Sequence, residues 1–142
     1  MRIFLTLLVA NSLWLVSNAD KPNIVIIFTD DQGYADLGCY GSKTNKTPRL
    51  DQLAKEGTMF TSFYTQAVCG PSRSALLTGR YPYRSKGWGM PASEITFSEL
   101  IKGAGYQTAC IGKWDVSNRK PIPERMPNAQ GLESFFAGVQ AN

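Results

Sequence analysis

Cys69 is the residue whose setting most suggests chemistry. It begins the run Cys-Gly-Pro-Ser-Arg, which leads on to Gly79. Because Pro71 suits the first helical position and Gly79 the position just past a helix end, the run predicts a short helix with Cys69 at its N-terminus. Unpaired amides and the helix dipole favour negative charge there, and Arg73 would lie beside the thiol. The pattern predicts a reactive thiolate or a bound anion at this position.

Two adjacent carboxylates, Asp30 and Asp31, form a second candidate group. They follow directly on the β-branched run 23–29, which predicts a strand buried on both faces, as in a parallel sheet covered by helices. Ligand sites of open α/β sheets gather at the carboxyl ends of strands, where two carboxylates could bind a hard divalent cation. Aspartate also favours solvated turns, so the pair alone leaves a metal site and a turn equally open.

Lys113 is a third candidate, because it follows the predicted strand 106–111 and would lie on the same ligand side of the sheet. Taken alone, it is equally compatible with a surface charge after a strand. Tyr83, Trp88 and Arg119 lie in predicted loops and could contact a substrate, although surface or packing roles are more usual for such residues.

The elements that must position these residues alternate between strands and helices. Thr47 as a cap, Pro48 in the first turn and Gly57 as a stop predict a helix. The aromatic and β-branched run 58–65 predicts the strand that leads to Cys69. This order is typical of an α/β fold.

The second half of the chain continues the alternation. A capping box at residues 96–99 starts a helix that ends near Gly103 or Gly105. After the strand that precedes Lys113, a proline-rich stretch over 116–128 predicts an exposed loop. Residues 132–138 contain two phenylalanines, and we expect a further buried segment to begin there.

The composition is that of one globular domain. The chain has 142 residues, enough for a hydrophobic core, and its 43% hydrophobic and 18% charged residues are ordinary values. The formal net charge of +4 fits an anionic small substrate as well as nucleic acid. Because no run of basic residues favours nucleic acid, we expect no such partner.

Residues 1–19 have the pattern of a signal peptide. A positive charge at Arg2 precedes an apolar run, and Ser17-Asn18-Ala19 has the form of a signal-peptidase site. The alternative, a membrane anchor, is disfavoured because polar residues interrupt a run shorter than about 20 residues. We therefore expect an exported protein with no membrane span after cleavage.

Export would permit disulfide bonds, and the chain has three cysteines. An odd number leaves at least one unpaired. If Cys69 is the reactive residue, Cys39 and Cys110 could pair, or both could be buried free thiols.

Four blocks of the sequence together resemble the amino-terminal part of the type I sulfatases. They are the carboxylate block at 24–33, the helix at 47–54, the cysteine block at 69–80 and the Gly-Lys-Trp block at 105–114. The resemblance covers nearly all of 22–138 in the family's order, and the cysteine block is highly specific.

The resemblance implies an alkaline-phosphatase-like α/β fold, with a mainly parallel central sheet and helices on both faces, and hydrolysis of sulfate esters. In the family, a formylglycine-generating or maturase enzyme oxidises the cysteine that matches Cys69. The hydrate of the resulting formylglycine (3-oxoalanine) is the nucleophile: one hydroxyl attacks sulfur, and the other expels sulfate as the aldehyde forms again.

The resemblance also implies roles for the other candidates. Asp30 and Asp31 would bind Ca²⁺, or another divalent cation, together with residue 69. Arg73 would stabilise the hydrate, and Lys113 would bind the sulfate oxygens where charge develops.

The chain departs from the family pattern in two ways. Where the family usually has a histidine two residues after the lysine, this chain has Asp115, and it contains no histidine. A carboxylate could accept or relay a proton, so Asp115 could mark a subgroup with an altered proton route. The alternatives are that Asp115 lies outside the site or that activity is lost. Family members also continue for several hundred residues and supply further metal ligands there. We therefore expect residues 20–142 to be the amino-terminal part of a sulfatase catalytic domain, with little or no activity alone.

The leading hypothesis is a formylglycine-dependent sulfatase that acts on sulfated carbohydrate or aryl sulfate in a periplasmic, extracellular or lysosomal compartment. A phosphoester or phosphonate hydrolase of the same superfamily is the alternative enzyme, and a non-catalytic secreted fragment is the alternative without catalysis.

Overall fold

The computed structural model describes residues 21–85, 89–116 and 122–138. The expected signal peptide over 1–19 lies outside the described residues, as do Trp88 and Arg119. Within the described ranges, no helix is both long enough and apolar enough to cross a bilayer.

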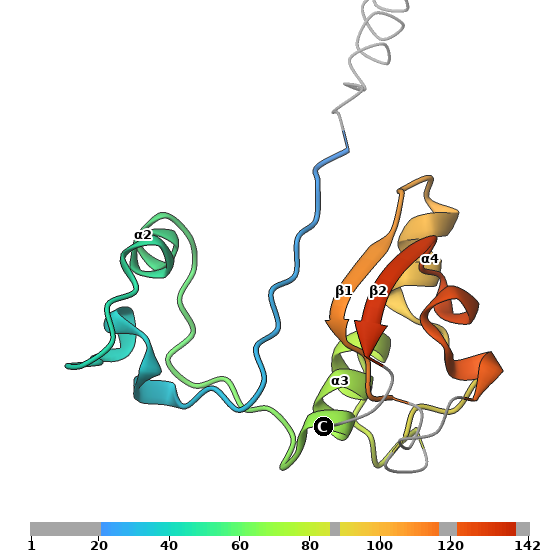
Figure 1. Cartoon of the computed structure of the whole chain (residues 1–142), viewed down its shortest axis with the longest axis horizontal. Helices are drawn as coiled ribbons and strands as arrows, with labels where there is room; N and C mark the ends of the chain where they lie inside the picture. Colours follow the sequence, from blue (N-terminus) through green and yellow to red (C-terminus); the bar gives the residue numbers. More distant parts are fainter. Residues whose placement is uncertain (1–20, 86–88, 117–121, 139–142) are drawn as a thin grey trace, which may run out of the picture.

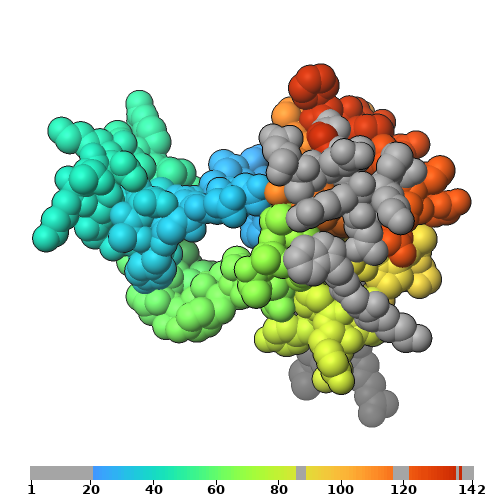
Figure 2. Space-filling model, turned by 60° about the horizontal axis from the view of Figure 1, so that its bottom comes forward, coloured from blue at the N-terminus to red at the C-terminus, as the bar shows by residue number. Residues whose placement is uncertain are grey.

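The chain forms two regions, which Figure 1 shows side by side. We call residues 33–61 the first region and the described part of 69–138 the second region. Two segments bridge the regions: residues 21–32, before the first region, and residues 62–68, after it. The space-filling view shows an open space between these two segments (Figure 2).

The first region consists of short helices, none of which contains a buried residue. In chain order they are η2 (Tyr34–Asp36), η3 (Gly38–Tyr40) and α2 (Pro48–Glu56). The hydroxyl of Tyr40 donates a hydrogen bond to the carbonyl of Phe60 at 2.9 Å, which attaches the segment after α2 to η3.

The predicted helix after Thr47 is confirmed as α2, with Pro48 in its first turn. The expectation that the Thr47 side chain caps this helix is wrong. Its hydroxyl donates to Asp51 Oδ1 at 2.9 Å and accepts from the N–H of Gly38 at 2.8 Å, and the same carboxylate oxygen accepts from the N–H of Cys39 at 2.7 Å. These bonds tie η3 to α2.

The second region contains two helices and a parallel pair of strands: α3 (Cys69–Thr78), α4 (Phe97–Gly103), β1 (Ala109–Lys113) and β2 (Ser134–Gly138). The 3-10 helices η4 (Pro123–Arg125) and η5 (Pro127–Gln130) lie between the strands in sequence. Ala109 pairs with Ser134 at one end of the ladder and Lys113 with Gly138 at the other. A parallel pair combined with helices confirms the predicted α/β class.

Both helices of the second region match their predictions. α3 begins at Cys69, two residues before the position predicted for its start at Pro71, and Gly79 follows its last residue with a φ of +64°, a conformation that glycine adopts without strain. α4 carries the predicted capping box, because Thr96 Oγ1 accepts from the N–H of Glu99 at 3.2 Å and the Glu99 carboxylate accepts from the N–H of Thr96 at 2.8 Å.

The described hydrophobic core lies in the second region. Its buried members are Leu77, Met90, Trp114, Val116 and Leu132, with Phe97 and Cys110 packed against them. These residues come from α3, α4, β1 and the segments after them. The core therefore fixes α3 relative to the end of β1.

Two predicted strands are wrong. Residues 23–29 run as an extended segment without a neighbouring strand (Figure 1), and residues 58–65 form no ladder either. Val25 is 81% exposed and Ile27 is 75% exposed, which is the opposite of burial on both faces. A strand needs backbone hydrogen-bond partners as well as an apolar pattern, and no described residue forms a ladder with either segment.

The predicted strand 106–111 is shifted. The N–H of Tyr106 donates to the carbonyl of Ile101 at 3.1 Å, so this residue still belongs to the turn after α4. β1 starts at Ala109 instead, and Lys113 is its last residue.

Two predictions about burial are wrong. The segment 132–138 does contain a strand, but Phe136 within it is 82% exposed. The stretch 116–128 was expected to be exposed, yet Val116 and Pro127 are fully buried. The burial of Val116 reflects packing between elements that are distant in sequence.

The described cysteines are all free thiols, so the Cys39–Cys110 pairing alternative is wrong. Cys110 lies in β1 against the core, and burial raises the pKa of its thiol. Cys39 lies half-buried in η3.

Candidate active site

Cys69 stands at the start of α3 because hydrogen bonds fix the preceding turn. The hydroxyl of Ser72 donates to the carbonyl of Val68 at 2.8 Å and accepts from the N–H of Gln66 at 3.1 Å. Val68 is the N-cap residue and has an extended backbone. The serine of the cysteine block therefore shapes the turn that presents Cys69.

Five residues that the sequence singled out lie together where α3 begins and β1 ends: Asp30, Cys69, Arg73, Lys113 and Asp115. A continuous series of contacts joins them. Cys69 contacts Asp115, which lies near Lys113, and Asp30 lies between Lys113 and Arg73.

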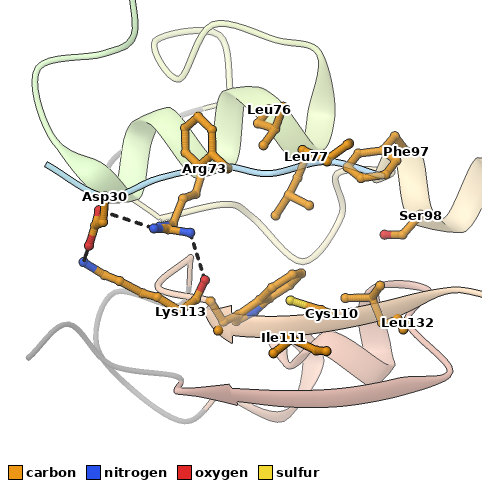
Figure 3. A pocket seen from close by; sticks show the side chains of 15 residues that line it. Asp30, Arg73, Leu76, Leu77, Phe97, Ser98, Cys110, Ile111, Lys113 and Leu132 are labelled. Atoms are coloured by element: carbon orange, nitrogen blue, oxygen red, sulfur yellow. Dashed lines mark hydrogen bonds and ion pairs between the residues drawn. The ribbon is translucent and has the colours of Figure 1, made fainter. Parts of the chain in front are cut away.

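Asp30 is paired with two cations (Figure 3). Its carboxylate accepts a hydrogen bond from Lys113 Nζ at 2.7 Å and lies 3.3 Å from a guanidinium nitrogen of Arg73. The hydrogen bond from Lys113 is the main cause that lowers the pKa of Asp30, and the same bond raises the pKa of Lys113. Both groups are therefore charged near neutral pH.

Arg73 attaches the end of β1 to α3. Its side chain is buried, and Nη1 donates to the carbonyl of Lys113 at 2.9 Å. The guanidinium also lies 5.4 Å from the ring centroid of Phe28, within range of a cation–π interaction. Sequence analysis did not single out Phe28, because its apolar neighbours made it look like an ordinary strand residue.

Asp115 contacts the candidate nucleophile directly. The Cys69 thiol donates to Asp115 Oδ2 at 3.2 Å, and Lys113 Nζ lies 3.7 Å from the same oxygen. The Asp115 residue is only 3% exposed. The structure thus places Asp115 in contact with the candidate nucleophile.

Asp31 does not join this series of contacts. It is exposed and has a φ of +54°, a left-handed conformation that aspartate tolerates in turns. It lies with Asp30 and Cys69 on the wall of one small pocket of about 220 Å³. The structure therefore places both carboxylates near the thiol while leaving Asp31 free of the ion pairs.

The candidate site offers only part of a ligand set for a divalent cation. In the described ranges, no group of three or more His, Cys, Asp or Glu side chains is arranged to hold a metal ion. The oxygens of Asp30 and Asp31 are of the kind that Ca²⁺ prefers, but a shell of about 6–8 oxygens needs further ligands. Asp30 and Asp31 therefore have suitable ligand atoms for such an ion, but they would supply only one side of its coordination shell.

A larger pocket of about 340 Å³ extends from the ion pairs along α3 and β1 (Figure 3). Asp30, Arg73 and Lys113 line one end, and most of the other lining residues are apolar side chains from α3, α4 and β1. The charged groups thus stand where an open pocket meets the core of the second region.

Known proteins of one family are similar to this chain in sequence. A family model described as Sulfatase matches residues 22–142. Arylsulfatase A of Homo sapiens is 45% identical over 129 residues, which cover 83% of this chain and 25% of that protein. The chain thus spans about a quarter of the length of this relative.

Solved structures are similar to this chain over most of its length. A crystal structure named Ps i-CgsB superposes with a TM-score of 0.78 at 38% identity, and the match covers 86% of this chain and 29% of that chain. Another structure, described as a complex with its substrate D-glucosamine-2-N,6-O-disulfate, has a TM-score of 0.68 at 34% identity and covers 82% and 23% of the two chains.

Proposed function

The chain belongs to the sulfatase family and holds an incomplete part of its alkaline-phosphatase-like α/β fold; from this membership we propose that it carries the nucleophile side of a site that hydrolyses sulfate esters. The observation that carries the proposal is the series of contacts from Cys69 through Asp115 and Lys113 to Asp30. Asp30 continues the series to Arg73, so the series joins a candidate nucleophile at the N-terminus of a helix to two cationic side chains.

Residue 69 is the proposed source of the nucleophile. Oxidised to formylglycine by a formylglycine-generating or maturase enzyme, it would supply a hydrate hydroxyl that attacks sulfur. The N-terminus of α3 supports this role, because its free amides and its dipole favour the negative charge that develops there.

Lys113 is the proposed sulfate-binding residue. Its ammonium lies 2.7 Å from Asp30 and 3.7 Å from Asp115, so the side chain is held at the pocket by two carboxylates. An ammonium held in this way can turn toward a third anion without leaving the pocket. A fixed cation beside the reacting sulfur would stabilise the charge of the transition state.

Arg73 is proposed to stabilise the hydrate of residue 69 from one helical turn further along α3. The carbonyl of Lys113 and the ring of Phe28 orient its guanidinium, and its Nε is buried without a partner in the described part of the chain. That Nε has a free N–H to donate. Arg73 also fixes Asp30 beside Lys113.

Asp30, Asp31 and the oxygen of the modified residue 69 would hold Ca²⁺ or another divalent cation, which would act as a Lewis acid on the sulfate oxygens. Asp30 already carries two cationic partners. A metal ion at Asp30 would therefore compete with Lys113, and its binding would leave the ammonium free for the substrate.

We propose a sulfated carbohydrate or an aryl sulfate as the substrate. Support comes from the sulfated sugar named for one structural neighbour and from the arylsulfatase among the relatives. The pattern of residues 1–19 supports a signal peptide and export to a periplasmic, extracellular or lysosomal compartment, with residues 20–142 as the amino-terminal part of the catalytic domain.

The modification is tested by mass spectrometry of the tryptic peptide that contains Cys69, taken from protein made in its native host. We expect the mass of the aldehyde or its hydrate. Unmodified cysteine alone would contradict the proposed nucleophile and would favour a non-catalytic secreted protein.

The reaction is tested on the full-length protein with paired sulfate and phosphate esters and with the variant Lys113→Ala. We expect preferential hydrolysis of the sulfate ester and a loss of kcat/KM of at least about 100-fold in the variant, as for removal of one preorganised charge-stabilising group. Lys102→Ala is the matched control, because Lys102 lies on α4 in a half-exposed ion pair with Glu133. Preference for the phosphate ester would instead support a phosphohydrolase.

A further inference from the structure

We propose that Asp115 is a positioning residue that binds the hydrate of residue 69 and stabilises it relative to the free aldehyde. The inference rests on the proposed function, because it requires that Cys69 is converted to formylglycine. It assigns to Asp115 a role that follows from its burial, its backbone conformation and its hydrogen bonds.

The Asp115 side chain is fixed by its neighbours in the chain. On one side, the indole N–H of Trp114 donates to the carbonyl of Arg125 at 2.7 Å. On the other side, the carbonyl of Val116 accepts from the N–H of Met90 at 3.0 Å. Both neighbours belong to the buried core, so the position of the carboxylate is set by the packing of the second region.

The backbone of Asp115 has a conformation that serves its contact. Its φ of +45° is a left-handed conformation that few non-glycine residues adopt, although aspartate tolerates it better than most. Non-glycine residues in this conformation gather at functional sites, where the surroundings determine the backbone. Here the left-handed turn directly after β1 brings the carboxylate to Cys69 at the start of α3.

The two oxygens of this carboxylate are not equally satisfied. Oδ2 accepts the hydrogen bond of the Cys69 thiol at 3.2 Å. Oδ1 is buried and has no hydrogen-bond partner within the described residues. A buried acceptor without a donor is unfavourable, so Oδ1 indicates a donor that the unmodified thiol does not provide.

The hydrate of formylglycine has the missing donor. A thiol carries one hydrogen, whereas the hydrate carries two hydroxyl groups on the same Cβ. Two hydroxyls can donate to the two oxygens of Asp115, and the aldehyde can donate to neither. The carboxylate therefore favours the hydrate over the aldehyde.

The equilibrium that Asp115 shifts involves no redox change. The oxygen of a water molecule bonds to Cβ of the aldehyde, the π electron pair of the C=O bond moves to the carbonyl oxygen, and one water proton is transferred to that oxygen. The earlier oxidation of the thiol to the aldehyde is the work of the maturase.

The test measures the hydrate and the aldehyde directly. The full-length protein is produced together with a formylglycine-generating enzyme and with cysteine labelled with carbon-13 at Cβ, whose resonance distinguishes thiol, aldehyde and hydrate. We expect mainly hydrate in the unchanged protein. In Asp115→Ala we expect the hydrate-to-aldehyde ratio to fall about 30-fold, as for the loss of two hydrogen bonds of ordinary strength.

Asp115→Asn and Asp36→Asn complete the design. The asparagine at 115 keeps the shape of the side chain and one accepting oxygen, so the ratio should fall by less, and the test does not depend on whether the alanine variant folds. Asp36 carries an exposed carboxylate in the first region, bonded to the N–H of Gly33, and its variant should leave the ratio unchanged.

Labelling with a hydrazide probe gives a second readout, because the probe reacts with the aldehyde and should label both Asp115 variants faster. An unchanged ratio in both Asp115 variants, with formylglycine present, would overturn this inference and leave the proposed function standing. A thiol resonance alone in the unchanged protein would overturn both.

Discussion

The two regions of the molecule are stabilised in different ways. The second region contains the described hydrophobic core, with Leu77, Met90, Trp114, Val116 and Leu132 buried together. The first region buries none of its residues, and hydrogen bonds to Asp51 hold its helices together. Since Cys69, Arg73, Lys113 and Asp115 all belong to the second region, the nucleophile side of the site rests on a packed scaffold.

The two halves of the candidate site therefore depend on their surroundings in different ways. The thiol and its partners are placed by helix caps, a strand and a core. The carboxylates Asp30 and Asp31 come from the extended segment before the first region, where side-chain contacts take the place of packing. Substitutions should therefore affect the regions unequally, and the following changes measure that inequality from the largest effect to the smallest.

Trp114→Ala should have the largest effect. The substitution removes a buried indole and its hydrogen bond to Arg125, and we expect the free energy of unfolding to fall by about 3–5 kcal/mol. Denaturant unfolding followed by circular dichroism measures it. Leu53→Ala in the first region is the control, because Leu53 is 61% exposed, and it should change stability by less than about 0.5 kcal/mol. Equal effects would abolish the contrast between the regions.

Asp51→Ala should loosen the first region alone. The N–H of Cys39 and the hydroxyl of Thr47 lose their acceptor, at a local cost of about 1–3 kcal/mol. Hydrogen exchange should accelerate across η3 and α2 and stay unchanged in β1 and α4. Asp51→Asn keeps one accepting oxygen and should show a weaker effect. Faster exchange at β1 would mean that the two regions unfold together.

Thr96→Ala should weaken the start of α4 by about 1 kcal/mol, because the hydroxyl accepts from the N–H of Glu99 and donates to the carbonyl of Gln130 at 2.8 Å. Thermal unfolding measures the change. Thr96→Ser keeps the hydroxyl and should restore most of the loss; if serine were as destabilising as alanine, the cap would not be the cause.

Cys110 should give the smallest effect, visible as a pH dependence. Burial raises the pKa of its thiol, so the neutral form is favoured in the folded protein. This stabilising contribution is complete below the ordinary thiol pKa and is lost as the pH rises through the raised value. In a protein with Cys39→Ser and Cys69→Ser, alkylation of Cys110 should require higher pH when folded than in denaturant. Identical profiles would show that the thiol is not shielded by the core.

The helices could be predicted from sequence because their signals are local. Pro48 and Gly57 bracket α2, Thr96 and Glu99 form the cap of α4, and Gly79 ends α3, each within a few residues. The strands at 23–29 and 58–65 could not be judged in this way, since pairing depends on partners far along the chain. An apolar run reports a preference for burial and says nothing about whether a neighbouring strand is present.

The residues of the candidate site could be predicted from the sequence, but their contacts could not. The sequence placed Lys113 and Asp30 near each other by the rule that ligand sites lie at the carboxyl ends of strands, and the structure pairs them although the segment before Asp30 is not a strand. It gave Asp31 the same role, whereas the structure leaves Asp31 exposed. The contact of Asp115 with Cys69 depends on a single left-handed residue after β1, and the cation–π contact of Phe28 with Arg73 joins residues far apart in the chain. The spacing of residues in the sequence predicts neither contact.

The extended segment 21–30 has a consequence for the behaviour of the protein in salt. Cations attach it at both ends: Lys21 donates to the carbonyl of Ala104, and Asp30 meets Arg73 and Lys113. Asp30 is exposed to solvent, and a charge pair with an exposed member weakens as ionic strength rises, since the screening length falls from about 10 Å at 0.1 M to about 3 Å at 1 M. We therefore expect Asp30 and Asp31 to be held less firmly at high ionic strength than in dilute buffer, while Cys69 keeps its position in the second region.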